Sequence, residues 1–517
     1  MFRRFAGVIA AAILLMSVST SSYGQQLVIG VVRQAKTLDP HFKDMVPNNR
    51  LRQHLFDTLI QQDANGNLKP GLATSWRAID ALTWEFQLRK DVVFHDGTPF
   101  TADDVIFTVQ RIPRMPQSPA PLLRYTRHIT GMEAPSPDAV LIRTDEPQPL
   151  FPNDLSRVAI VSRKAMEGKT LAELNTGEVW VGTGPYRFVS WVRGKQLVLA
   201  RNESYWGGAQ PWSQVVFRQI ADEKGRIQAV GKGVDVVERV SVNAFDMLRR
   251  NRKISIVQKA SNRLIYLHMD SGREVSPFVR EVEDNPLQKE KVRRALSYAI
   301  DRTYLTNNIL KGAGTPAGQF TAKGSTGYVE GVAPDKHDPK QAIRLLASAG
   351  YRNGFWITVH GPNNRFINDS RVASAIGQML GRVGLRTRVD TMNRIVFFPR
   401  AAKGDFSLML VGQSIELGDP ARTILEVLGK PSKNGISGRA NLGGYANKQL
   451  DELLAQVMQA VEPDVRERLL QSAIKTALED YGIIPLYFER NSWAIKKPLK
   501  MTPRLDGLTT AMSIQPK

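Results

Sequence analysis

Cysteine is absent from all 517 residues of the chain. Its absence excludes disulfide bonds, thiolate metal sites, cysteine nucleophiles and a lipid-modified N-terminal cysteine. Long apolar runs are missing too, because no stretch reaches the roughly 20 apolar residues that a helix needs to cross a bilayer. We therefore expect a mature chain with neither a lipid anchor nor a membrane span, and not a permease.

Motifs of catalysis and of nucleotide binding are also missing. No two of the seven histidines stand three or four residues apart, which is the spacing of zinc ligands on a helix. No Gly-x-Ser-x-Gly motif supplies a hydrolase nucleophile, and Gly231-Lys232 lacks the other residues of a phosphate-binding loop. We predict no catalytic residue, no metal site and no cofactor.

The first 24 residues have the layout of an export signal. Arg3 and Arg4 precede an uncharged apolar run at 8–16, and the small residues Ser22 and Gly24 stand three and one positions before Gln25. We predict cleavage after Gly24 and a periplasmic mature protein. An N-terminal membrane anchor is the alternative, and the shortness of the apolar run disfavours it.

Positive charge dominates the composition. Lys and Arg number 70 against 49 for Asp and Glu, a formal net charge of +21. Such a charge can attract acidic ligands, anionic membranes or nucleic acid. The basic residues are scattered and form no run of five or six, so nucleic-acid binding is not expected. A solvated, repulsive surface explains the charge, and acidic ligands remain the alternative.

The length is too great for one hydrophobic core and fits two or three domains. Apolar residues at helical spacing alternate with short apolar strands, which is the order of an α/β fold. Thr101 is expected to cap a helix with Asp103 and Asp104 in its first turn, where the helix dipole favours negative charge. Four prolines between 113 and 121 predict a surface loop. The expected strands lie at 26–32, 84–88, 198–201, 215–220, 385–389 and 483–488, and the expected helices at 51–59, 292–300, 339–349, 372–383, 447–461 and 463–480.

Four blocks of the sequence resemble the peptide-binding receptors of bacterial ABC importers, solute-binding protein family 5, which includes dipeptide-, oligopeptide-, nickel- and heme-binding proteins. The blocks are 72–76 with 86–105, 182–188 with 202–208, 292–302 with 338–351, and 418–420 with 484–486. Most of their residues suit the scaffold: Gly97 and Gly184 suit turns, and Trp76, Phe94 and Ile300 suit cores.

The resemblance implies an α/β, two-lobed periplasmic binding protein fold of the type II-like class, with an extra domain inserted in the N-terminal lobe. The implied parts are lobe I at 25–66, 182–274 and 484–517, the insert at 67–181, and lobe II at 275–483.

The resemblance also implies where a ligand binds. In dipeptide and oligopeptide receptors, an acid just after a Gly-Trp pair binds the α-amino group of the peptide. Glu416 stands at that position here, and Gln413 replaces the Trp. Asp419 is the next candidate acid, although its place in a Gly-Asp-Pro sequence favours a turn.

A second candidate segment, 362–369, resembles a pocket-facing segment of the family. In it, the planar fork of Arg365 would hold a ligand carboxylate, with Asn363 close by. The alternative is a surface arginine that pairs with Asp369.

The implied function is capture of a peptide by closure of the two lobes, followed by delivery to the permease and cytoplasmic ATPase subunits of an ABC importer. We expect a monomer that binds no nucleic acid and catalyses no reaction. The replaced Trp at Gln413 leaves open a non-peptide solute, such as heme, a nickel chelate, an opine or a glycoconjugate. A periplasmic hydrolase or chaperone on the same scaffold is the remaining alternative.

Overall fold

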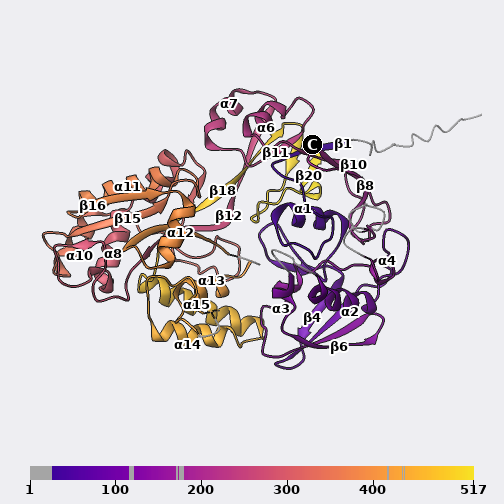
Figure 1. Cartoon of the computed structure of the whole chain (residues 1–517), viewed down its shortest axis with the longest axis horizontal. Helices are drawn as coiled ribbons and strands as arrows, with labels where there is room; N and C mark the ends of the chain where they lie inside the picture. The colour runs from indigo at the N-terminus through magenta and orange to yellow at the C-terminus, as the bar shows by residue number, and fades with distance from the viewer. Residues whose placement is uncertain are drawn as a thin grey trace, which may run out of the picture.

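The computed structural model describes residues 26–115, 122–169, 173, 180–415, 418–432, 435 and 437–516. Two bodies stand side by side and are joined by long strands (Figure 1). The expected export signal lies outside the described residues. Among the helices of the described ranges, none is long and apolar enough to cross a membrane.

Lobe I is built around β1 (Gln26–Val31), whose buried side chains place it at the centre of the sheet. It pairs in parallel with β10 (Gln214–Gln219) and β11 (Val236–Glu238). The antiparallel strands β9 (Gln196–Arg201) and β8 (Tyr186–Val192) extend the sheet. Helix α1 (Val46–Leu55), which has a proline in its first turn, packs Leu51 and Leu55 into the same core.

The insert contains a separate antiparallel sheet in the order β4-β5-β7-β6. The strands are β4 (Ala73–Ala78), β5 (Thr83–Leu88), β6 (Ile129–Ser136) and β7 (Ala139–Thr144). Helix α2 (Ala102–Arg111) covers it and opens with the predicted cap, since the Asp104 carboxylate accepts the Thr101 N–H at 3.0 Å. Phe94 is buried as predicted, whereas Trp76 is only partly buried.

Lobe II has strands covered by helices on both faces. Its strands are β13 (Val279–Arg280), β15 (Trp356–Pro362), β16 (Arg386–Met392) and β17 (Leu408–Ser414), and β15 runs parallel to β16 and β17. Helices α8 (Glu290–Ala299), α10 (Pro339–Ser348) and α11 (Asp369–Arg382) pack into one core. Helices α12 (Arg394–Ala402), α13 (Ala421–Leu428), α14 (Lys448–Val457) and α15 (Pro463–Glu479) contribute to the other.

Two residues differ from expectation in the structure. Ile343, one of the apolar residues at helical spacing in the expected helix 339–349, is 47% exposed, whereas Ala342 and Leu346 of the same helix are buried. Gly184 does not need a left-handed turn. A Cβ at Gly184 would lie 2.5 Å from the carbonyl carbon of Leu55 at the end of α1, so close packing of two backbones requires the glycine. Gly97, with φ of +84°, does need the turn conformation.

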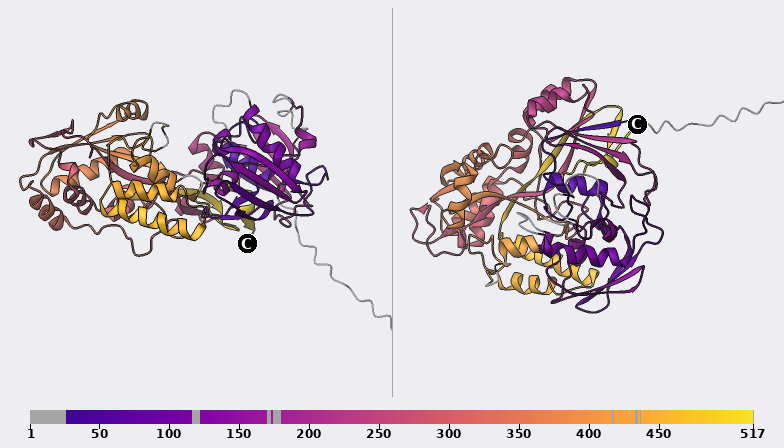
Figure 2. Two further views of the ribbon diagram at one scale, coloured as in Figure 1. Left: turned by 90° about the horizontal axis from the view of Figure 1, so that it is seen from below. Right: turned by 45° about the vertical axis from the view of Figure 1, so that its right-hand side comes forward.

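Two long strands, β12 (Ile254–Met269) and β18 (Ile484–Lys496), pass through both lobes and join them in one twelve-stranded sheet. The crossing is visible between the two bodies in Figure 2. On the lobe I side, residues 254–260 of β12 pair with β18, and on the lobe II side residues 263–269 pair with β17. Strand β18 continues to Lys496, beyond the end expected near Phe488.

The shorter elements complete the two lobes and the insert. They are β2 (Ile60–Gln62), β3 (Leu68–Pro70), α3 (Phe151–Leu155), α4 (Arg163–Met166), α6 (Glu223–Ala229), α7 (Phe245–Arg250), α9 (Arg302–Tyr304), β14 (Gly314–Pro316), β19 (Leu499–Met501) and β20 (Ile514–Pro516).

Candidate functional site

The strands that join the lobes lose their regular pairing where they cross. Ala260 of β12 pairs with Arg490, and the next pair along the strands is Leu264 with Phe488, so residues 261–263 have no regular partner on β18. A bulge of this kind bends a strand and changes its twist. The crossing is therefore the place where the backbone can accommodate a change in the angle between the lobes.

Asn262 ties this crossing to two other segments. Its side-chain amide donates to the carbonyl oxygen of Ile415 at 2.8 Å, and its backbone N–H donates to the carbonyl oxygen of Leu505 at 3.3 Å. The end of β17 and the C-terminal return into lobe I thus meet at the crossing.

The loop that follows β15 is held by two buried carboxylates. Asp369 accepts the backbone N–H groups of Arg365 at 2.8 Å and Phe366 at 3.0 Å. Glu489 of β18 accepts the N–H of Ile367 at 2.8 Å. Because both carboxylates bind backbone groups, the loop is fixed relative to the crossing strands.

The side chain of Arg365 is exposed and forms no ion pair with any described residue. The alternative, in which it pairs with Asp369, is not what the structure shows, since Asp369 binds backbone N–H groups. Partial burial lowers the pKa of Arg365, and the like charges of Arg263 and Arg394 lower it further. A guanidinium among like charges, with no carboxylate of its own, suits an incoming anion.

Arg263 has one counter-charge at this site. Its Nη1 lies 3.1 Å from Glu489 Oε2, whose side chain is 8% exposed. Glu489 also accepts the N–H of Ile367, so it is shared between the crossing strand and the loop. The charged side chains that act on the pKa of Arg365 are two cations, Arg263 and Arg394, and one carboxylate, Glu489. Three neighbouring cations therefore share one carboxylate.

Two more predicted residues lie at the same edge of the lobe II sheet. Asn363 is exposed directly after β15, and its N–H donates to the Met392 carbonyl oxygen at 2.9 Å. Gln413 is partly buried near the end of β17, opposite Leu264 of β12. Since β15 and β17 are parallel neighbours, their carboxyl ends bring Asn363, Arg365 and Gln413 to one edge.

Asp419 has a structural role in this structure. Its carboxylate is 3% exposed and binds Arg466 through contacts of 2.6 and 3.1 Å. It also accepts the N–H of Ala421 at 2.8 Å, as expected of an acid in a turn that opens a helix. Because both carboxylate oxygens already have partners, we do not expect Asp419 to bind the ligand.

Glu416 lies outside the described residues, so its side chain is not placed. The described residues on either side of it are at the junction of the lobes. Ile415 donates its N–H to the Asn262 carbonyl oxygen at 2.8 Å, and a Cβ on Gly418 would lie 2.3 Å from the Gly66 oxygen of lobe I.

The sequence model of the bacterial extracellular solute-binding proteins, family 5, matches residues 67–435. This range covers well over half of the chain and includes the loop after β15 and the end of β17. The chain belongs to this family. The resemblance carried by the four sequence blocks is thereby confirmed, and the family consists of binding proteins, not of enzymes.

Related proteins align over almost the whole length of the chain. The chain is 24% identical to the probable D,D-dipeptide-binding periplasmic protein DdpA of Escherichia coli over 92% of its residues and 90% of that protein. It is 28% identical to the glutathione-binding protein GsiB of Escherichia coli over 94% of its residues and 93% of that protein.

Solved structures share the fold. The murein tripeptide-binding protein MppA in its unliganded open form matches with a TM-score of 0.83 at 23% identity, covering 95% of this chain and 97% of that one. DppA from Helicobacter pylori in complex with the peptide STSA matches with a TM-score of 0.67 at 21% identity, covering 95% and 98%. The two-lobed binding-protein fold expected from the resemblance is therefore confirmed.

The structure adds Asn262, Arg263 and Glu489, which sequence reasoning did not select. The sequence around Glu489 contained a signal that could have identified it as a site residue, because Glu489 and Arg490 interrupt the apolar run that begins at Ile484. Arg263 carried none, since it is one of many scattered basic residues. Its importance depends on the crossing of two strands that are more than 200 residues apart in sequence.

The insert and lobe II also touch directly. Asp154 of α3 and Arg422 of α13 form a two-point ion pair with contacts of 2.6 and 2.7 Å. Their side chains are 4% and 33% exposed. Burial raises the pKa of Asp154, and the hydrogen bonds and charge of Arg422 oppose that rise. Val461, between α14 and α15, also packs against the core of the insert.

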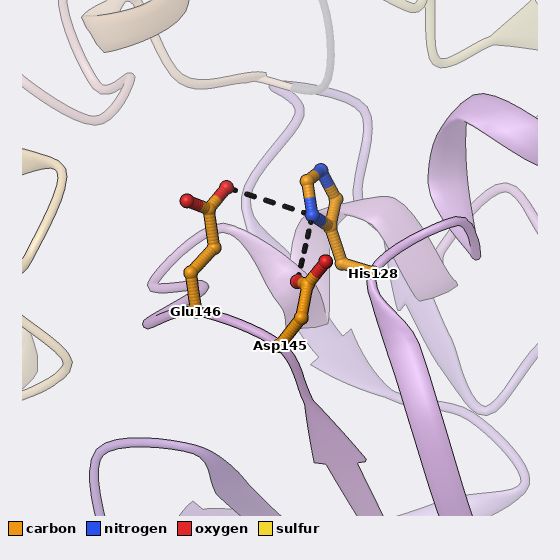
Figure 3. A group of neighbouring side chains, drawn as sticks. All are labelled: His128, Asp145 and Glu146. Atoms are coloured by element: carbon orange, nitrogen blue, oxygen red, sulfur yellow. Dashed lines mark hydrogen bonds and ion pairs between the residues drawn. The ribbon is translucent and has the colours of Figure 1, made fainter.

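One group of possible metal ligands occurs in the described part of the chain: His128, Asp145 and Glu146 (Figure 3). His128 Nδ1 lies 3.0 Å from Asp145 and 3.5 Å from Glu146, while Arg127 Nε donates to His128 Nε2 at 3.0 Å. A ring nitrogen that accepts this bond has no proton, so the hydrogen-bond pattern assigns the proton to Nδ1, facing the acids. We interpret the group as a hydrogen-bond network, because metal ligation needs that nitrogen deprotonated.

Proposed function

We propose that this chain is the periplasmic receptor of an ABC importer and that it captures peptides between its lobes. The observation that carries the proposal is the exposed Arg365, without an ion-pair partner among the described residues, on a fixed loop beside the strands that join the lobes. The names of the relatives support the ligand class, since they state binding of a D,D-dipeptide and of glutathione. The peptide held by DppA agrees with it.

In this proposal, the lobe II edge recognises both ends of the peptide. Arg365, supported by the charge of Arg263, binds the carboxylate, because a guanidinium matches the two oxygens of a carboxylate. Glu416 binds the α-amino group, as the resemblance implies. Asn363 and Gln413 supply side-chain amides that can pair with the peptide backbone.

A non-peptide anion is the second candidate solute. Two observations favour it. The three neighbouring cations Arg263, Arg365 and Arg394 can bind an anion that has no amino group, and Gln413 stands where the resemblance places a Trp in peptide receptors. An opine or another polycarboxylate would satisfy this pattern. Binding of such a solute, with no response to any peptide, would replace peptides in the proposal and leave the receptor role in place.

We propose capture by closure about the two crossing strands. We propose that the lobes meet at the crossings, 261–263 and 489–490, where the regular pairing of β12 and β18 is interrupted; the resemblance implied boundaries near 274 and 484.

Adding the solute is therefore expected to reduce the radius of gyration measured by small-angle X-ray scattering, because the lobes close on it. The same solute should stabilise the protein by about 2.7 kcal/mol at a hundredfold excess over the dissociation constant, which a thermal-shift screen of peptides detects. Tight binding without compaction would contradict closure. A solute that is consumed on incubation would instead favour the hydrolase alternative.

The periplasmic location follows from the proposed export signal. Deleting residues 1–24 should leave a folded protein in the cytoplasm, because the segment is removed during export and adds nothing to the core. N-terminal sequencing of the periplasmic protein should begin at Gln25. A mature chain that begins at Met1 would contradict cleavage. As partners we propose the permease and ATPase subunits of the importer, with a monomeric receptor.

A further inference from the structure

Lobe I and the insert together line an open cavity of about 570 Å³. Its walls come from the end of α1, the segment that contains β2 and β3, the turn around Arg157, the Tyr205-Trp206-Gly207 segment and the C-terminal return. All lining residues fall within 52–210 or 502–513, so lobe II contributes none. The volume is within the range of small-molecule sites, roughly 300 to 1,000 Å³.

Both acids that line the cavity are already engaged. Asp57 is buried and accepts hydrogen bonds from Trp206 at 2.8 Å, Gln61 at 2.9 Å, Thr183 at 3.1 Å and Tyr205 at 3.2 Å. Burial raises the pKa of Asp57 to about 6, and these four donors oppose the rise.

The second acid, Asp63, closes its own turn. It accepts the backbone N–H groups of Asn65 at 2.7 Å and Asn67 at 2.9 Å. Neither acid therefore forms an ion pair with the cations of the cavity.

Four cations line the same cavity: Arg52, Lys69, Arg157 and Arg504. Arg504 is paired with Asp506 at 2.7 Å. Arg52 and Arg157 form no ion pair with any residue that the structure describes. Arg52 is only 4% exposed, and its Nη1 has no hydrogen-bond partner. The Nε of Arg157 is likewise buried without a partner.

Asp44 interacts electrostatically with both arginines, and other donors already hold it; Arg157 also acts on Asp506, which is paired with Arg504. Asp44 accepts Tyr125 at 2.5 Å, Arg124 at 2.7 Å and Asn49 at 2.8 Å. Burial lowers the pKa of Arg52; Asp44 opposes that shift, and the like charge of Arg157 adds to it. The two guanidiniums thus share a carboxylate that does not contact them.

A buried guanidinium with an unused N–H group is costly, and a second one beside it adds repulsion. An oxyanion between the two would supply acceptors for the unused N–H groups and compensate both charges. We propose that this cavity, which is lined by lobe I and the insert and by no residue of lobe II, is a second ligand site and that it binds a small multivalent oxyanion, a phosphate or a polycarboxylate, through Arg52 and Arg157.

Binding is tested by calorimetric titration of the full mature protein with inorganic phosphate and with citrate, at an ionic strength held constant with chloride. We expect saturable one-site binding of at least one of the two, and a higher thermal midpoint in its presence. Phosphate binding alone identifies a phosphate site, and citrate binding alone a polycarboxylate site. No saturable binding of either anion would overturn the proposal.

Arg157→Gln should weaken this binding by about tenfold or more, because it removes a charged hydrogen-bond donor of roughly 1.5 to 3 kcal/mol. The matched control is Arg143→Gln, which removes the same charge from an exposed position on β7 and should bind the anion as the wild-type protein does. Circular dichroism of both variants verifies the fold, and Arg157→Lys, which keeps the charge, should retain part of the affinity.

A variant of the proposed solute site separates the two sites. Arg365→Gln should leave anion binding unchanged, and Arg157→Gln should leave binding of the imported solute unchanged. If Arg365→Gln removes anion binding and Arg157→Gln does not, the anion binds at the junction of the lobes and the second site is overturned. The proposed receptor function is unaffected by that result.

Discussion

Arg365→Gln is expected to weaken binding of a peptide with a free carboxylate by about 2 to 5 kcal/mol, the usual effect of removing one member of a charge pair that closure buries. Glu416→Gln is expected to have an effect of the same size through the peptide's α-amino group. Calorimetric titration of each variant with a peptide found in the thermal-shift screen measures both losses. The fold should persist, because Arg365 forms no ion pair with any described residue.

Modified peptides show which end of the ligand each residue binds. A peptide amidated at its C-terminus should bind the wild-type protein as weakly as Arg365→Gln binds the free peptide, and amidation should cost the variant little more. An N-acetylated peptide should show the same relation with Glu416→Gln. Such non-additivity marks a direct pair, whereas full additivity would mean that the two groups do not meet.

The matched control for Arg365 is Arg371, an exposed arginine in the first turn of α11. Arg371→Gln removes the same charge close by in the sequence and should leave the dissociation constant within about twofold, since exposed charges act mainly on association rate. Equal losses of affinity in the two variants would show that Arg365 acts only through the general positive charge of the surface and does not contact the ligand.

Arg422→Gln is expected to lower the free energy of unfolding by about 3 to 5 kcal/mol, because it leaves the carboxylate of Asp154 buried without its partner. That carboxylate is only 4% exposed. Denaturant unfolding, followed by tryptophan fluorescence, measures the loss. The double variant Arg422→Gln with Asp154→Asn should recover most of the stability, since no unpaired charge then remains buried.

An ion pair of lobe II with an exposed arginine provides the control. Arg439 and Glu426 lie 2.7 Å apart, with side chains 60% and 17% exposed. Arg439→Gln should cost about 0 to 1 kcal/mol, the range of solvent-exposed pairs. Equal losses for Arg422→Gln and Arg439→Gln would show that the contact between the insert and lobe II adds no more to stability than a surface pair.

Local signals in the sequence were sufficient for many secondary elements. The capping box of Thr101 and Asp104 begins a helix in the structure, and Asp338 accepts the Gln341 N–H at 2.9 Å to begin α10. The apolar stripe that contains Val292 and Leu296 is buried. These features depend on hydrogen bonds and spacing within a few residues, so the chain itself contains the information.

The strand near the C-terminal end shows a feature that local signals did not predict. Its apolar part predicts residues 483–488, whereas β18 runs on through Glu489, Arg490 and Asn491 to Lys496. Polar residues continue the strand because β12 pairs with them. Glu489 also binds Arg263 and accepts the N–H of Ile367. A single sequence does not show that these partners will be adjacent.

The sequence by itself determined the family and the α/β class, because family blocks and apolar spacing are local patterns. It named Asn363, Arg365 and Gln413 through the family resemblance, whereas the neighbouring strands β15 and β17 that bring them to one edge were not predicted. The tertiary structure decided which candidate acid is paired elsewhere and which arginines form no ion pair with a described residue. Asp419 is paired with Arg466, whereas Arg365, Arg52 and Arg157 form no ion pair with a described residue. Charge compensation depends on distances of a few ångströms between segments far apart in the chain, and only the fold sets those distances.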